Sequence, residues 1–154
     1  MIMVNLTERV KINRREVMRG MITLNQANKA LEASQQKAKE LGISVSIVIV
    51  DEHGALIAAN RMDAALPISP QIAHAKAFTA ASLGVPSEGL AEYVKEGKPY
   101  FGINTLFGGK LTPMAGGLPV MKANKIVGGV GVGGSADVAQ DAECAKAAVE
   151  TMQL

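Results

Sequence analysis

The sequence of 154 residues is poor in aromatic side chains and in cysteine. It has no Trp, three Phe and two Tyr, so its core must be built from aliphatic side chains. So few rings also argue against a surface that stacks nucleic-acid bases. The single cysteine, Cys144, excludes an internal disulfide, and a chain without a disulfide framework is typical of the reducing cytoplasm.

Long apolar runs and strong charge are absent as well. No segment reaches the roughly 18 apolar residues of a membrane-spanning helix. In the first 20 residues, charges interrupt every short apolar run, so a signal peptide is not predicted. The formal net charge is only +2, and residues 1–21 carry five basic and two acidic side chains. The rest of the chain is therefore nearly neutral and has no charge excess to attract a polyanion. We expect a soluble cytoplasmic protein that binds neither nucleic acid nor membrane.

The chain divides into a short extension and one domain. Residues 1–20 are basic and show no clear amphipathic period, so they are predicted to be an N-terminal extension. Residues 21–154 are predicted to form a single domain, because the whole chain is 48% hydrophobic and 19% charged, a globular composition.

Turn and cap residues predict the order of the elements. Thr23 and Gln26 form a capping-box pattern before a helix that ends at Gly42. The stretch "VSIVIVDEHGALIAAN" then predicts a hairpin with strands at 45–50 and 55–60. Ser69 and Pro70 are predicted to be the cap and the first residue of the next helix.

The second half of the domain is predicted as a short helix, about three strands and a final helix. The short helix runs from Pro86-Ser87 to about residue 96, and a short strand is placed around 103–107. Strands at 118–123 and 126–132 follow, and the last helix begins near Asp137. One face of that helix is predicted to be apolar and consists of Val138, Ala142, Ala145, Val149 and Met152. Consecutive strands with short turns predict an α+β fold: an antiparallel sheet of about five strands flanked by helices.

Gly129, Gly131 and Gly134 have the G-x-G-x-x-G spacing of a dinucleotide-binding loop. That loop needs a second strand with an acidic residue about 20 positions further on, and the chain stops 20 residues after Gly134. No G-K-[ST] follows either, so we expect no bound nucleotide. Two interpretations remain: a close approach of one backbone to another, and a carboxylate or phosphate bound at the helix N-terminus after Ser135.

Four stretches, in order, resemble the GlcG/HbpS family, which includes the C-terminal domain of PduO-type proteins. They are "IVIVDEHGALIAANRMD", "IAHAKAFTA", "AGGLPV" and "IVGGVGVGGSADVAQDAECAKAA", within residues 21–152. Many relatives have "GVSG" where this chain has "GVGG", so a serine hydroxyl is missing at Gly133. The resemblance implies a profilin-like sheet and a homo-oligomer built from dimers.

The resemblance also implies a small-molecule ligand. Some relatives bind haem, and others belong to glycolate or to diol and glycerol metabolism. We therefore predict a binding protein for haem, with a corrinoid as the second choice, accessory to such metabolism. Two alternatives stay open: an enzyme acting on a small hydroxylated or carboxylated metabolite, although no nucleophile–base pair stands out, and an assembly module without cofactor.

The helix that contains "IAHAKAFTA" supplies three candidate ligand contacts. His74 could ligate haem iron and is then the only metal ligand expected; the alternative is a partly exposed helical histidine. Lys76 could bind a propionate or another anion, and Thr79, on the same helix face, could add a hydroxyl. Lys76 could equally pair with a carboxylate at an interface. His53, in a turn, is expected to be exposed.

Further candidates lie outside that helix. Arg61 could clamp a ligand, pair with Asp63 or orient the loop that follows. Gly116 and Gly117 would let the backbone approach a ligand, and they equally suit a bulge at the start of a strand. Thr112 and Pro113, in the same glycine-rich region, are expected to border a pocket. Cys144 has no predicted base beside it, so we expect it to take no part in chemistry.

Overall fold

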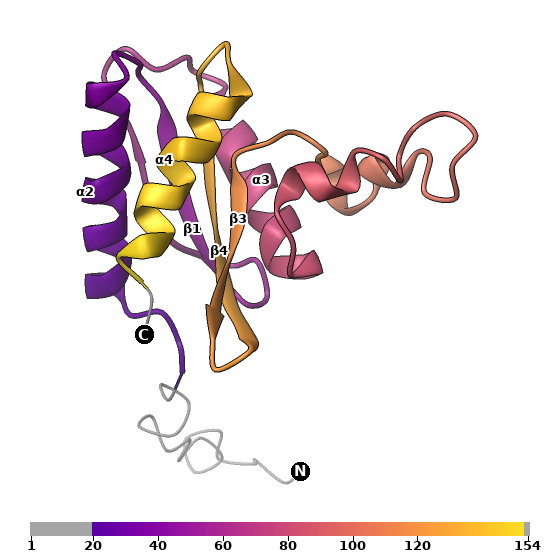
Figure 1. Ribbon diagram of the computed structural model, residues 1–154, viewed down its shortest axis with the longest axis horizontal. Coiled ribbons are helices and arrows are strands. Elements are labelled where there is room, and N and C mark those ends of the chain that lie inside the picture. Colours follow the sequence, from indigo (N-terminus) through magenta and orange to yellow (C-terminus); the bar gives the residue numbers. More distant parts are fainter. Residues whose placement is uncertain (1–19, 153–154) are drawn as a thin grey trace, which may run out of the picture.

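A four-stranded antiparallel sheet forms the centre of the computed structural model, which describes residues 20–152 (Figure 1). The strands are β1 (Ser46–Asp51), β2 (Leu56–Arg61), β3 (Gly117–Lys122) and β4 (Lys125–Gly133). They lie in the order β2-β1-β4-β3, so β1 and β4 are the central strands. The α+β class is confirmed, whereas the sheet has four strands and not about five. The likeness to profilin stays a prediction.

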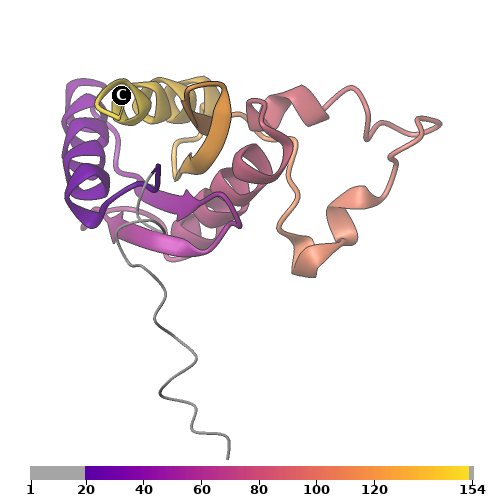
Figure 2. The same ribbon diagram turned by 90° about the horizontal axis from the view of Figure 1, so that it is seen from below.

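Three helices cover the two faces of the sheet (Figure 2). Helices α2 (Leu24–Glu40) and α4 (Val138–Glu150) contact each other and pack on one face, and α3 (Ser69–Leu83) packs on the other. The main core cluster lies under α2 and α4 and consists largely of Ala, Val, Ile and Leu. This composition is what a chain so poor in aromatic residues requires.

The predicted start of α2 is confirmed in detail. The Thr23 hydroxyl accepts a hydrogen bond from the Gln26 N–H, and the Gln26 side chain accepts one from the Thr23 N–H. These two bonds satisfy donors that the first helical turn leaves free. The helix ends where Gly42 takes up a left-handed backbone conformation with φ +68°.

The predicted hairpin is confirmed as β1 and β2. Its turn is held by the Asp51 carboxylate, which accepts hydrogen bonds from the N–H groups of His53 (2.8 Å) and Ala55 (2.9 Å). A bulge between Ile49 and Val50 shifts the register by one residue, and the second strand begins at Leu56.

The glycines of β4 lie directly beneath α3. A Cβ on Gly129 would collide with the Ala77 carbonyl oxygen, and one on Gly131 with the Ala73 carbonyl oxygen. Both glycines are buried, so no loop is open to a pyrophosphate here. The G-x-G spacing therefore serves the close approach of one backbone to another, as in the first interpretation above.

Ser69 was predicted to cap α3, but it is the first residue of that helix. Ile68 occupies the cap position and has no side-chain capping bond. The buried Ser69 hydroxyl lies 2.8 Å from the Ser46 hydroxyl on β1 and donates to the Leu66 carbonyl (2.7 Å). Tertiary contact with the sheet has thus replaced the local capping bond, a competition that sequence pattern alone does not resolve.

The region between α3 and β3 differs most from the sequence prediction. The helix expected to reach residue 96 is only the 3₁₀ helix η1 (Ser87–Leu90), and the strand expected at 103–107 is replaced by η2 (Ile103–Thr105) and η3 (Phe107–Gly109). Positive φ angles at Gly102, Phe107 and Gly108 explain the error, because a left-handed residue interrupts an extended strand. Residues 84–113 are here called the projecting arm: their two ends pack against the domain, and the loop between them extends away from the sheet and helices (Figures 1 and 2).

The final helix begins as predicted, with Asp137 as its cap, but its buried face is rotated from the predicted one. Val138 is exposed, while Asp141 and Cys144 are buried. The predicted N-terminal extension lies, apart from Gly20, outside the described residues. Among residues 20–152, no helix is both long and apolar enough to cross a membrane.

Gly131→Ala tests the packing of α3 on β4. The new methyl group would fall on the Ala73 carbonyl, so we expect the free energy of unfolding to drop by about 1–3 kcal/mol, the usual cost of overpacking. Urea denaturation measures the loss. The control is Gly89→Ala, whose Cβ would meet only the Val85 side chain at 3.5 Å or more. Equal stability of the two variants would contradict this packing.

Candidate functional site

Two hollows lie along the exposed face of α3 and share one wall residue, Gln71. The first has a volume of about 260 Å³, and its lining also includes His74 and, from the sheet, Val48, Leu56 and Ala59. It exists because α3 lies mainly over β4, β1 and β3 and leaves the edge strand β2 largely uncovered. Mostly apolar walls with one imidazole are typical of small-molecule sites.

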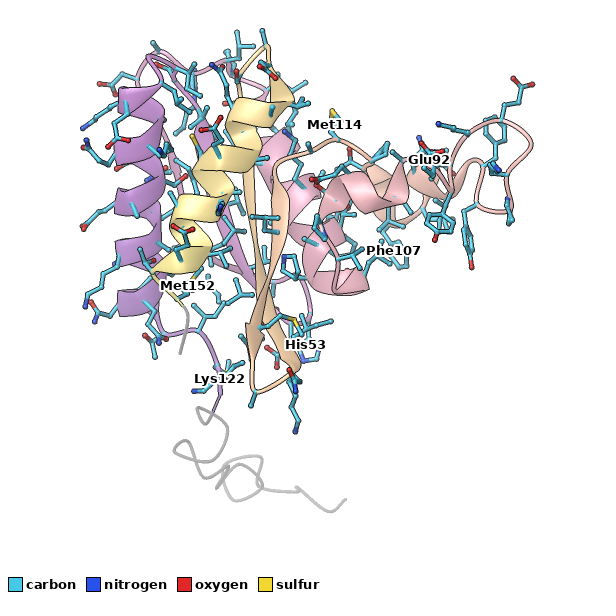
Figure 3. All side chains as sticks on the ribbon, viewed as in Figure 1. His53, Glu92, Phe107, Met114, Lys122 and Met152 are labelled. Carbon is cyan, nitrogen blue, oxygen red and sulfur yellow. The ribbon has the colours of Figure 1, made fainter. Side chains whose placement is uncertain are left out.

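The second hollow lies between α3 and the returning end of the projecting arm. Its volume is about 300 Å³, and the helix supplies Ile68, Ile72 and Ala75. Thr112 and Pro113, predicted to border a pocket, line it together with Leu111 and Met114. Figure 3 shows Met114 where the arm rejoins the domain. Side chains 40 residues apart in sequence thus share one hollow.

His74 is the only titratable side chain in the lining of these two hollows. Its Nε2 lies 3.4 Å from the Gly54 carbonyl oxygen, a long contact that holds the ring weakly. His53, in contrast, lies in the hairpin turn with 82% of its side chain exposed, as predicted (Figure 3). Within the described residues, no three His, Cys, Asp or Glu side chains gather as a metal site.

Lys76 faces the interior and is paired with Asp141 of α4. The Nζ–Oδ2 distance is 2.8 Å, and both side chains are 1% exposed. The Ser135 N–H donates to the other carboxylate oxygen at 3.1 Å. Burial raises the pKa of Asp141 above its usual value, while the hydrogen bond and charge of Lys76 oppose that rise. In this arrangement Lys76 binds a carboxylate of its own chain, and its contact with a ligand stays a prediction.

Gly116 packs against this ion pair, and Gly117 packs against the backbone of Lys76. A Cβ on Gly116, whose φ is +114°, would lie 3.0 Å from the Lys76 Nζ and 2.9 Å from the Asp141 Cβ. A Cβ on Gly117 would collide with the Lys76 carbonyl oxygen. Both glycines thus allow the start of β3 to approach α3, which is a structural use of their small size. Neither lines the two hollows.

Thr79 and Arg61 also bond within the chain. The Thr79 hydroxyl accepts from the Thr112 N–H at 2.9 Å and lies 2.8 Å from the Ala75 carbonyl. Thr79 therefore supports the wall of the second hollow from behind. The Arg61 guanidinium donates twice to the Ala65 carbonyl, at 2.8 and 3.0 Å, and so orients the loop after β2, one of its three predicted roles.

Two residues of the site were missed at the level of sequence. Asp141 is 65 positions from Lys76, and a lone Asp in a helix gives no local sign of a buried partner. Gln71 precedes His74 by three positions, so the same-face rule for helices could have identified it. Cys144 is fully buried, and burial raises the pKa of its thiol to about 11. At neutral pH it is therefore protonated and a poor nucleophile, in line with its expected inactivity.

A family model described as "Haem degrading protein HbpS-like" matches residues 22–150, nearly all of the described chain. The chain belongs to this family. Protein GlcG of Escherichia coli is 38% identical over 112 residues, which are 73% of this chain and 81% of GlcG. The GlcG/HbpS resemblance of the sequence motifs is thus confirmed.

Two comparisons concern PduO proteins. The corrinoid adenosyltransferase PduO of Salmonella typhimurium is 27% identical over 133 residues, which are 86% of this chain but only 39% of PduO. The chain therefore spans well under half the length of that relative. A crystal structure of a PduOC–haem complex superposes with a TM-score of 0.80 at 26% identity, covering 87% of this chain and 99% of that one.

The buried ion pair gives a stability prediction. Lys76→Met leaves the Asp141 carboxylate buried without its partner, so we expect the free energy of unfolding to fall by about 3–5 kcal/mol. The double variant Lys76→Met/Asp141→Leu removes both charges and is expected to recover most of that loss. Urea denaturation of the three proteins measures both effects.

The control for this experiment is Lys37→Met, which breaks the exposed Lys37–Glu40 pair (3.4 Å). An exposed pair contributes less than about 1 kcal/mol. A loss for Lys76→Met no larger than that of Lys37→Met would show that the buried pair does not stabilise the fold.

Cys144 gives a reactivity prediction. Its pKa rises from 9.0 to about 11, so the folded protein holds roughly 100-fold less thiolate at neutral pH than the unfolded chain. We expect a disulfide reagent to modify Cys144 at least that much more slowly in native buffer than in urea, followed by absorbance of the released thiolate. Comparable rates in the two conditions would refute the burial of this thiol.

Proposed function

We propose that this protein binds haem along the exposed face of α3. The observation that carries the proposal is the pair of mainly apolar hollows that meet at Gln71, with His74 in the wall of the first. A flat, largely apolar macrocycle matches a long apolar surface with a single nitrogen ligand. When bound, the haem supplies an iron centre whose properties depend on that ligand and on its surroundings.

The size of the site supports a ligand that spans both hollows. Ligand pockets usually measure roughly 300–1,000 Å³. The first hollow, of about 260 Å³, lies below this range, and the second, of about 300 Å³, is at its lower end. A small metabolite would fill one of them, whereas a tetrapyrrole needs the combined surface on both sides of Gln71.

His74 is the proposed iron ligand. Its one described polar contact is the 3.4 Å approach to the Gly54 carbonyl, so releasing the ring costs little. A neutral imidazole nitrogen is a common axial ligand of haem iron. The first hollow places apolar side chains beside the ring, and these would shield the iron from water.

Lys110 is a better candidate for a haem propionate than Lys76. Lys76 is buried and paired with Asp141, and its release would leave that carboxylate unpaired. Lys110 is exposed, and its neighbours Gly109 and Leu111 both line the second hollow. Its Nζ lies 5.5 Å from the centre of the Phe78 ring, so the ammonium group stays near α3.

The relatives support haem as the ligand. The HbpS-like family is described by its haem chemistry, and the PduOC structure of the same fold is a haem complex. A corrinoid is the second choice, because PduO is a corrinoid adenosyltransferase. We propose with this an accessory role in glycolate or diol and glycerol metabolism, and self-association of the chain into a dimer-based oligomer in the cytoplasm.

A haem titration tests the proposal. We expect the Soret band to shift in a saturable, one-to-one manner, and His74→Ala to weaken binding at least about tenfold and to change the position of the band, because an axial ligand is lost. Ala75→Phe, which fills part of the second hollow, is expected to weaken binding without changing the iron ligand.

His53→Ala is the matched control, because it removes the only other histidine of the chain from an exposed turn. It is expected to bind haem like the unchanged protein. A titration without a saturable shift would exclude haem, and corrinoids would be tested next. A shift equally unaffected by His74→Ala and Ala75→Phe would place the ligand away from α3.

A further inference from the structure

The helix face that lines the two hollows continues to Phe78. Three residues of this face line the hollows, namely Gln71, His74 and Ala75. Phe78 follows His74 by four positions, which is one helical turn, so the two side chains are neighbours. The Phe78 ring is half-buried and packs on the hairpin turn, where a Cβ on Gly54 would collide with it. An aromatic ring in a fixed position therefore borders the proposed haem site.

The projecting arm also contacts this ring. The ring centres of Phe107 and Phe78 lie 5.8 Å apart, and the Lys110 Nζ lies 5.5 Å from the centre of the Phe78 ring. These distances are typical of favourable aromatic and cation–π contacts. Between these two arm residues lies Gly109, which lines the second hollow. Phe107 thus lies where the arm meets α3, close to the second hollow (Figure 3).

The backbone of Phe107 has a conformation that a large side chain rarely adopts. Its φ is +52°, in the left-handed region, and Gly108 and Gly109 follow with φ +66° and +78°. Glycine at position 107 would fit this turn without strain. The Phe107 side chain is 65% exposed, so core packing does not explain why a phenylalanine is here. Strain of this kind is typical of residues that contact a ligand.

We propose that Phe107 is a specificity-determining residue of the haem site: its ring packs beside Phe78 against the bound macrocycle and favours a flat, conjugated ligand. Aromatic rings gain most from a partner that offers a planar π surface. A small aliphatic metabolite has no such surface, and a corrin ring is puckered and carries projecting amide groups. The inference rests on the proposed haem site, and it names the residue that distinguishes haem from a corrinoid there.

A haem titration of Phe107→Ala tests this role. We expect the dissociation constant to rise about five- to tenfold, because one aromatic contact with the ligand is lost. Phe107→Tyr keeps the ring and is expected to bind haem like the unchanged protein. Phe101→Ala is the matched control, because Phe101 lies on the same arm and is 66% exposed, whereas the ring that packs on Phe78 is Phe107.

Phe107→Gly separates binding from folding. It removes the same ring as Phe107→Ala but also relieves the left-handed strain, so it is expected to unfold at a higher temperature than Phe107→Ala. The two variants are nevertheless expected to bind haem equally weakly, because both lack the ring. Thermal unfolding of the haem-free proteins, set beside the titrations, provides this comparison.

Cyanocobalamin tests the selectivity. We expect the unchanged protein to bind it at least about tenfold more weakly than haem, and Phe107→Ala to narrow that difference. Saturable haem binding that Phe107→Ala leaves unchanged would overturn the role of Phe107 and leave the site on α3 standing. Haem binding that follows thermal stability across the Phe107 variants would overturn it too, since the residue would then act only through folding. An unchanged protein without saturable haem binding overturns both proposals.

Discussion

The fold depends on how closely α3 lies on β4. Glycines at 129 and 131 leave no side chain between the strand and the helix, so the helix backbone rests almost on the strand backbone. The helix meets them with Ala73 and Ala77, which add little thickness. This contact determines where α3 lies, and so it determines which part of β1 and β2 stays uncovered. The hollow beside His74 is a direct result.

Local chemistry made much of this fold predictable. The capping box at Thr23, the "DEHG" turn held by Asp51 and the cap at Asp137 each act within a few residues. Such signals can be read from a single sequence, because both partners lie in one short window. The glycine-rich segment before β3 has no such pairs. Its turns depend on left-handed residues, among them Phe107, that composition does not identify.

The candidate site was predictable in part, for a related reason. His74 could be identified because histidine is rare here and carries its own chemistry, and Thr112 because it lies among turn residues. The partner of Lys76 could not be identified from the sequence, because it depends on how α4 packs across the sheet. The rotated face of α4 has the same origin: the buried Asp141 and Cys144 follow from tertiary packing and not from apolar periodicity.

The walls of the second hollow differ in how they can respond to a ligand. On one side, α3 packs directly on the glycine backbone of β4 and is joined to α4 by a buried ion pair. A displacement of α3 would therefore open voids or leave a buried charge unpaired. On the other side, the arm reaches the hollow through the short 3₁₀ turns η2 and η3, whose side chains are mostly exposed. Ligands of different size would therefore be accommodated by the arm. Natural variation in ligand choice among relatives should accordingly appear in this segment, while α3 and β4 could change only together.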